Sequence, residues 1–183
     1  MLNPSLPQDT LVAFLHPSGI NNYVFIGGEM PHWIKRVVNG LENSGKQGHK
    51  RNLLLNGQSL RLDMIRRAWE DVEMGGISTL RQTKLTIDHF VKNPHSRMRV
   101  FLSVQILSSS VHELLWKYVD GNDELTVKYS SLMSIVLMLD RLIDIWNHPD
   151  SKGFECINSP NHQYIDELES ILLIFSKWKN ATI

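Results

Sequence analysis

The amino-acid sequence predicts a mainly α-helical protein that begins with a small α/β segment. Short β-branched or aromatic runs occur near the start of the chain, and apolar residues at helical spacing dominate from residue 59 onward. Glycine and proline fall at the ends of the predicted helices. The chain has 183 residues, 42% of them hydrophobic, which suits one domain, or one domain and part of another, with a substantial core.

Charge and composition exclude several classes of protein. The 19 Lys and Arg residues balance 19 Asp and Glu residues, so the chain is not a polycation that coats nucleic acid. A single cysteine, Cys156, excludes an intrachain disulfide framework. The longest nearly unbroken apolar run, 132–139, is too short to span a bilayer, and the N-terminus lacks the pattern of a signal peptide. We therefore expect an intracellular protein, nuclear or cytoplasmic, that is not secreted and has no membrane partner.

The α/β segment consists of two predicted strands and a helix. Residues 10–15 and 23–26 are β-branched or aromatic runs, and a turn-like stretch separates them. A glycine pair, an acid and Pro31 then open a helix, because proline suits a first helical turn. Its apolar residues recur at helical spacing: Ile34, Val37, Val38 and Leu41. Residues 43–58 are predicted to be a loop with a basic tip and a short apolar segment.

Two helices are predicted in the middle of the chain. Ser59 is the predicted N-cap of the first, which has an apolar face and ends at Gly75 and Gly76. Thr86 is the predicted cap of a second, short helix that ends before Pro94. Glycine and proline therefore define both helix ends.

Three longer helices follow, over residues 98–119, 125–146 and 164–178. The helix 125–146 is apolar around almost its whole circumference, which is typical of a buried helix. The final helix has five residues that we expect to face inward: Ile165, Leu168, Ile171, Leu172 and Phe175.

One short motif has the spacing of a phosphate-binding loop. Gly40, Gly45 and Lys46 match the pattern GxxxxGK. A P-loop also needs Ser or Thr after the lysine to hold magnesium, and a strand before it. Here Gln47 follows the lysine and a helix precedes the motif, so we interpret 40–47 as a solvated loop.

The histidine pattern does not predict a metal site or a catalytic centre. The eight histidines are not spaced to share one helical face with a second ligand. The nucleophile elbow and the catalytic-cysteine context are both missing as well.

A polar stripe marks the C-terminal end of the predicted helix 125–146. Asp140, Asp144 and Asn147 fall at positions i, i+4 and i+7. One interpretation is that the helix meets water along this stripe. The other is that the stripe lines a ligand groove, where a carboxylate accepts hydrogen bonds from adjacent N–H donors such as those of guanine.

A basic block precedes the predicted helix 98–119. It contains Lys84, Arg97 and Arg99, and the two arginines lie beside the free N–H groups of a helix start. This arrangement suits an anion or phosphate, although basic residues at exposed helix starts often bind nothing specific. Both interpretations remain open at this point.

Three blocks of residues resemble P-element-type transposases, the group that includes the THAP-domain transposases. Residues 23–35 resemble the strand–acid–PHxIK segment of that family. Residues 84–89, followed by 98–108, resemble its KLTxxH … KMKVxLAxQxxS block, and 142–147 resemble its LFDxxN block. The blocks occur in the order of the family and span 23–147, which is most of the chain.

The resemblance implies an RNase H-like fold that holds two metal ions with three carboxylates for DNA cleavage and joining, interrupted by a helical GTP-binding insertion. Residues 1–57 would be a partial RNase H-like segment with its linker, and 58–183 the insertion-like domain. Glu29 stands at the position of a metal-binding Asp, and its longer side chain would displace the metal. We therefore expect no catalytic residue and no metal site. The chain would be a transposon-derived fragment or a truncated, domesticated copy that is not catalytically complete on its own.

The resemblance also implies a set of nucleotide-binding residues. It places Lys84, Arg99, Val100 and Ser108 around the nucleotide and Asp144 at the guanine base, with Arg99 in place of the usual lysine. GTP is thus the implied cofactor, optionally with Mg²⁺, and it would serve the binding of transposon DNA ends within a longer protein. The alternative is a helical protein-interaction module that has lost nucleotide binding. Unpaired sheet edges additionally favour self-association.

Overall fold

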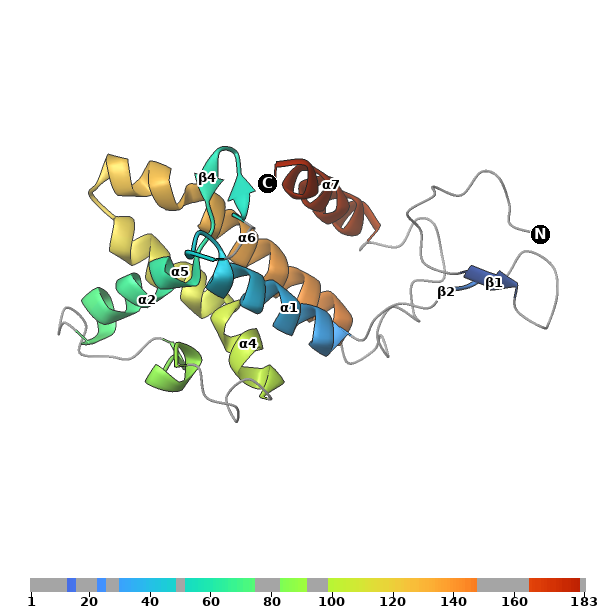
Figure 1. Cartoon of the computed structure of the whole chain (residues 1–183), viewed down its shortest axis with the longest axis horizontal. Coiled ribbons are helices and arrows are strands. Elements are labelled where there is room, and N and C mark those ends of the chain that lie inside the picture. The colour runs from blue at the N-terminus through green and yellow to red at the C-terminus, as the bar shows by residue number, and fades with distance from the viewer. Residues whose placement is uncertain are drawn as a thin grey trace.

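The computed structural model describes residues 13–15, 23–25, 30–48, 52–74, 83–91, 99–147 and 165–181. Across these ranges the chain is mostly helical, with two small antiparallel strand pairs (Figure 1). The predicted fold class, mainly α with a small α/β segment, is therefore confirmed. A search of the described ranges for a helix long and apolar enough to cross a membrane finds none.

The first strands and the first helix follow the sequence prediction. β1 (Ala13–Leu15) pairs antiparallel with β2 (Tyr23–Phe25). α1 (Met30–Asn43) has Pro31 in its first turn, where the missing proline N–H costs no hydrogen bond. One face of α1 is buried, with residues at helical spacing: Met30, Ile34, Val38 and Leu41.

A strand pair replaces part of the loop predicted over 43–58. β3 (Leu54–Leu55) and β4 (Gln58–Ser59) form a tight hairpin. Its two turn residues, Asn56 and Gly57, have positive φ angles of 51° and 75°, as a type I′ turn requires. The Asn-Gly pair is the sequence signal for this turn. The loop prediction for 43–58 depended on composition and did not use the Asn-Gly turn signal.

The prediction that Ser59 caps the next helix is wrong. Ser59 belongs to β4, and α2 (Leu62–Trp69) begins after Arg61, whose side chain makes no capping hydrogen bond. The backbone of Ser59 pairs with that of Leu54 in the hairpin, so this residue is not at a helix start. The serine hydroxyl instead donates to Asn52 Oδ1 at 3.0 Å.

Two short helical turns lie between α2 and the next long helix. α2 continues into η1 (Glu70–Met74), a π-helical turn. η2 (Ile87–His89) is a single 3-10 turn, and Thr86 occupies its N-cap position. The short helix predicted after Thr86 is thus a single 3-10 turn, and its predicted end before Pro94 lies outside the described residues.

The single helix predicted over 98–119 is two helices. α4 (Val100–Ile106) ends before Ser108, and α5 (Ser109–Val119) begins after it. Ser108 has an extended backbone, with φ −94° and ψ 157°, and its carbonyl accepts the Val111 N–H at 2.9 Å to start the new helix. Three consecutive serines favour such a break, because serine hydroxyls compete for backbone hydrogen bonds and stabilise helix starts over helix interiors.

The longest helix confirms the prediction for 125–146. α6 (Asp123–Asn147) spans 25 residues, and Leu132, Ile135 and Leu139 on it are fully buried. Its circumference is not buried all round, since Leu137 is 47% exposed. The helix thus keeps one exposed strip while it forms the centre of the protein.

The final helix confirms three of its five predicted inward residues and contradicts one, and the side chain of Ile165 lies outside what the structure describes. α7 (Ile165–Ala181) buries Ile171 and half-buries Leu168 and Phe175, as expected. Leu172, however, is 63% exposed. α7 packs against the rest of the described protein along one narrow face. Leu172 follows Ile171 in the sequence and lies outside that face.

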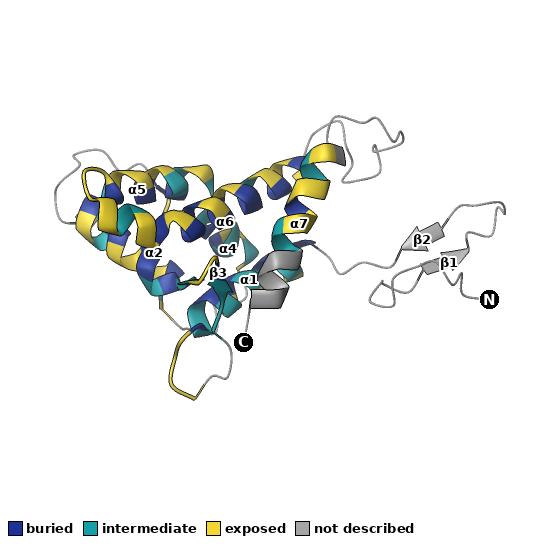
Figure 2. Cartoon of the chain, turned by 90° about the horizontal axis from the view of Figure 1, so that it is seen from above, coloured by how far each residue is buried: buried dark blue, intermediate teal, exposed yellow. Residues whose placement is uncertain are grey.

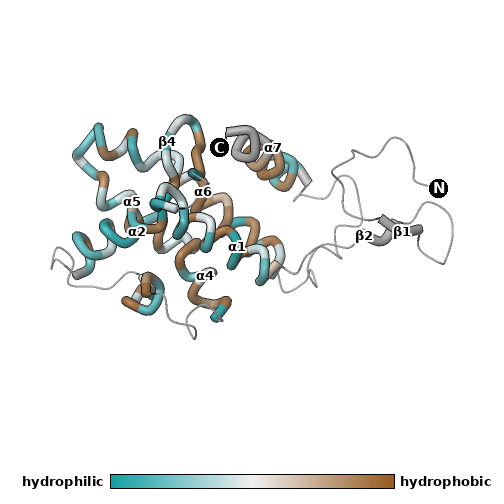
Figure 3. The backbone as a smooth tube through the Cα atoms, viewed as in Figure 1, coloured by the Kyte–Doolittle hydropathy of each residue, from teal (hydrophilic) through white to brown (hydrophobic). Residues whose placement is uncertain are grey.

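The core is a single hydrophobic cluster shared by the helices. It joins side chains of α1, α2, α5, α6 and α7 with those of the β3–β4 hairpin. Figure 2 shows the buried faces of the helices turned toward one another, with exposed residues on the outside. The α4 tube in Figure 3 is mostly hydrophobic, in keeping with its packing against α1. The residues of α1 therefore belong to the same core as the helices that follow.

Candidate functional site

Lys84 lies on a segment whose backbone is held from both sides. Its neighbours Thr83 and Leu85 are 7% and 1% exposed, whereas the Lys84 side chain is exposed. The Thr83 N–H donates to Glu73 Oε1 at 2.8 Å, and the Thr83 hydroxyl donates to Glu73 Oε2 at 3.0 Å. Both oxygens of one carboxylate thus hold the residue next to Lys84.

His89 connects the same segment to α4. Its ring is 8% exposed, and its Nδ1 accepts the Thr86 N–H at 2.9 Å. Since Nδ1 accepts, the proton of the neutral ring is on Nε2, which lies 2.9 Å from Gln105 Oε1 and donates to it. His89 and Gln105 both belong to the residue blocks that carry the family resemblance, which implies no role for either of them. In the structure, their hydrogen bond joins η2 to α4.

Arg99 and Val100 lie at the start of α4. Arg99 occupies the N-cap position and is exposed, while Val100 is half-buried as the first residue of the helix. The His89–Gln105 hydrogen bond ties η2 to α4, and the two elements pack together. Lys84 precedes η2 in the chain, and Arg99 precedes α4 as its N-cap residue.

Ser108 and the polar stripe of α6 meet at the break between α4 and α5. The Ser108 hydroxyl donates to the Gln105 carbonyl at 2.8 Å. The neighbouring Ser109 donates through its N–H and its hydroxyl to the Asp140 carboxylate, which therefore satisfies the start of α5. Burial raises the pKa of Asp140, the hydrogen bonds from Ser109 oppose that rise, and the nearby charge of Asp144 adds to it.

Asp144 lies one turn beyond Asp140 and is exposed. Its charge acts on Asp140, so it lies near the break that contains Ser108. Asp140 has a structural partner, whereas Asp144 and Asn147 are exposed residues of the stripe. Within the described residues, no hydrogen bond or ion pair joins Lys84, Arg99 and Asp144 to one another. Glu29 lies outside the described residues.

An open cleft of about 330 Å³ lies elsewhere, between the end of α1, the start of α2 and the segment after η2. The predicted nucleotide-binding residues do not line it. The residues that do are Glu42, Ser44, Lys46, Arg61, Leu62, Asp63, Arg66 and Phe90.

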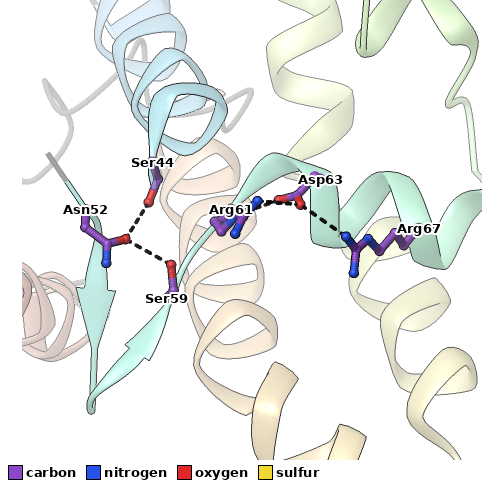
Figure 4. A network of polar contacts seen from close by, with 6 residues as sticks. All are labelled: Ser44, Asn52, Ser59, Arg61, Asp63 and Arg67. Atoms are coloured by element: carbon purple, nitrogen blue, oxygen red, sulfur yellow. Dashed lines mark hydrogen bonds and ion pairs between the residues drawn. The ribbon is translucent and has the colours of Figure 1, made fainter. Parts of the chain in front are cut away.

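A polar network beside this cleft fastens the β3–β4 hairpin to α1 (Figure 4). Asn52 Oδ1 accepts the hydroxyls of Ser44 and Ser59 at 3.2 and 3.0 Å. Ser44 is only 2% exposed, and its oxygen also accepts the Leu53 N–H at 2.9 Å. The network therefore satisfies buried polar groups at the hairpin base.

The cations of the cleft already have carboxylate partners. Arg61 contacts Asp63 through two hydrogen bonds of 2.9 and 2.8 Å (Figure 4), and Arg66 pairs with Glu70 at 2.7 Å. Lys46, the lysine of the GxxxxGK motif, lies 3.8 Å from Glu42. Gly40 of the motif lies inside α1. The motif thus has a helix in place of the strand that a P-loop requires.

The described residues offer no ready metal centre. No group of three or more His, Cys, Asp or Glu side chains among them is arranged to hold an ion. Lys84, Arg99 and Asp144 are exposed, whereas Ser108 is half-buried and its hydroxyl donates to the Gln105 carbonyl. Exposed cations suit a phosphate, and an exposed carboxylate suits a hydrogen-bonding base.

Comparison with known proteins finds a shared fold. No protein-family model matches the sequence, and no curated protein has a similar sequence. A solved structure, the Drosophila P element transposase strand transfer complex, matches 91% of this chain with a TM-score of 0.65 and 23% sequence identity. The match covers 36% of the transposase chain, so this chain spans about a third of that protein's length. The chain therefore has the fold of a segment of the P element transposase.

Proposed function

We propose that this chain is a P-transposase-like segment whose helical part binds GTP. The observation that carries the proposal is the likeness of fold, which extends over 91% of the chain. The motif blocks over 23–147 resemble the same family. Two independent comparisons, of residues and of backbone, thus support the same origin.

Each predicted residue has a chemical role in such a site. Lys84 and Arg99 are exposed cations that precede the packed elements η2 and α4, and they suit the phosphates of the nucleotide. Asp144 is an exposed carboxylate, an acceptor that can receive the adjacent N–H donors of guanine but not the pattern of adenine. Val100 and Ser108 offer apolar and hydroxyl contacts beside them.

We propose that the nucleotide is a structural cofactor and is not hydrolysed by this segment. In a longer protein it would stabilise the helical part for binding of transposon DNA ends, with Mg²⁺ as an optional companion of the phosphates. DNA cleavage is not assigned to this chain, because Glu29 replaces the metal-binding Asp that the resemblance implies.

Thermal melting of the full chain tests GTP binding. A ligand at 100 times its dissociation constant stabilises the folded state by about 2.7 kcal/mol, which is several degrees for a chain of this size. We expect this shift with GTP and Mg²⁺, and no shift with ATP and Mg²⁺. Equal shifts with both nucleotides, or none with either, would contradict a guanine-selective site.

A pair of variants locates the site in the same experiment. Asp144→Ala should abolish the GTP shift with little change in melting without nucleotide, because the side chain is exposed. Asp71→Ala removes an exposed carboxylate on η1 and should keep the full shift. A shift that survives Asp144→Ala would place the guanine elsewhere.

The second candidate function is a helical protein-interaction module. Large apolar side chains on α5 and α6 are exposed and favour it, namely Trp116 at 58%, Val127 at 65% and Leu137 at 47%. This candidate predicts that GTP does not change the melting temperature. The melting experiment therefore separates the two functions.

A further inference from the structure

The segment 83–91 is anchored much more firmly than a surface connection requires. Four kinds of contact hold it: the Glu73 carboxylate at Thr83, the burial of Leu85, the His89 ring between Thr86 and Gln105, and a ring contact of Phe90 with Trp69 at 5.3 Å. Lys84 is the long cationic side chain that remains exposed between them.

The contact with Glu73 fixes the backbone immediately before Lys84. The carboxylate accepts both the Thr83 N–H and the Thr83 hydroxyl, at 2.8 and 3.0 Å. The same hydroxyl oxygen accepts the Leu85 N–H at 3.3 Å, so the two residues that flank Lys84 are joined by one side chain. The backbone of Lys84 therefore has little freedom.

The contact with His89 fixes the segment against the element that carries Arg99. His89 Nε2 donates to Gln105 Oε1 at 2.9 Å, on α4, and Arg99 is the N-cap residue of that helix. Lys84 and Arg99 thus precede two elements that are hydrogen-bonded to each other. A binding site whose groups are ordered before the ligand arrives loses less conformational entropy on binding.

We propose that Glu73 and His89 are positioning residues of the nucleotide site, which hold Lys84 and Arg99 in place to receive the phosphates of a nucleoside triphosphate. This inference depends on the proposed function. Neither residue touches the nucleotide. Glu73 acts by fixing the backbone before Lys84. His89 acts by holding η2 against α4, whose N-cap residue is Arg99.

A double-mutant cycle tests the role of Glu73. GTP affinity of the full chain, measured by calorimetric titration with Mg²⁺, should fall about tenfold in Glu73→Ala. In a chain that already carries Lys84→Ala, the same substitution should change the affinity less than twofold, because the residue through which Glu73 acts is gone. A purely structural role would lower the affinity equally in both chains.

Conservative variants keep the test valid if Glu73→Ala folds poorly. Glu73→Gln retains an oxygen for the Thr83 N–H and an amide that can donate to the Thr83 hydroxyl, so it should restore affinity to within about twofold of the wild type. For the second positioning residue, His89→Asn keeps an acceptor for the Thr86 N–H but is too short to reach Gln105. It should weaken GTP binding, and the melting temperature without nucleotide should fall by a few degrees because one buried hydrogen bond is lost.

The outcomes distinguish this inference from the proposed function. If the wild-type chain binds GTP and both Glu73→Ala and His89→Asn bind it equally well, the positioning role is wrong and the site stands. The same conclusion follows if Glu73→Ala weakens binding to the same extent with and without Lys84. If the wild-type chain does not bind GTP, the proposed function fails and this inference fails with it.

Discussion

Arg141 and Glu167 form an ion pair that joins α6 to α7 at the level of single residues. The Arg141 Nε and Nη2 atoms donate to the two Glu167 oxygens at 2.6 and 2.9 Å. The hydrogen bonds from Arg141 hold the pKa of Glu167 below its ordinary value of 4.5. Because the folded-state pKa is lowered, the stabilisation is present above pH 4.5 and is lost as the pH falls through the folded-state pKa.

Removing the arginine should therefore raise the pKa of Glu167. We expect it to return toward 4.5 in Arg141→Ala, as measured by carboxyl carbon NMR during an acid titration. The stability lost at neutral pH should stay under about 1 kcal/mol, because both side chains are substantially exposed. Lys128→Ala removes an exposed cation from the same helix and should leave the Glu167 titration unchanged. An unaltered pKa in Arg141→Ala would show that another group sets it.

In the candidate site, the residue types predicted which side chains are exposed better than they predicted which side chains form hydrogen bonds with each other. Lys84, Arg99 and Asp144 are exposed, as charged side chains usually are. The sequence placed Asp140 in the same stripe as Asp144, but only the structure separates them, because Asp140 bonds Ser109 on another helix. Such a partner lies too far along the chain for residue spacing to indicate it.

At the scale of elements, the start of α6 depends on one side chain. Asn122 Oδ1 accepts the Leu125 N–H at 3.0 Å, an N-cap hydrogen bond. We expect Asn122→Ala to lower the free energy of unfolding by about 1 kcal/mol in urea denaturation. Asn122→Asp keeps the acceptor and should lose much less. Equal losses in both variants would mean that the amide group has another role.

Periodicity predicted the positions of helix ends less well than it predicted the helices themselves. The apolar spacing continues through 98–119, but the chain breaks at Ser108 because a new set of backbone hydrogen bonds begins there. Periodicity reports which residues face the core and is insensitive to such a break when both helices bury similar faces. The three serines were the available signal.

At the scale of the whole molecule, α1 and the later helices share one core. Ile34 and Leu41 are 3% and 0% exposed within the cluster that contains α2, α5 and α6. The predicted division at 57/58 passes through the hairpin that joins α1 to α2, between β3 and β4. The domain division itself stays a prediction that truncation can test.

Two shortened chains provide that test. A chain of residues 30–183 keeps α1 and the hairpin, so we expect a cooperative thermal transition by circular dichroism. A chain of residues 58–183 lacks α1 and β3, which leaves buried apolar surface of α2 and α6 uncovered. We expect it to lose the cooperative transition. A cooperative and equally stable 58–183 chain would instead support an independent domain that begins at residue 58.

The sequence by itself determined the helical character of the protein, the strands at its start, most of the core residues and the family resemblance. These properties depend on residue type and on spacing within a few turns, so they are legible along the chain. Only the tertiary structure decided which polar groups meet. Glu73 and Thr83 are 10 residues apart, and His89 and Gln105 are 16 apart, with a stretch of chain between each pair. Such contacts depend on how the helices pack, because a side chain finds a distant partner only after the core has brought their elements together.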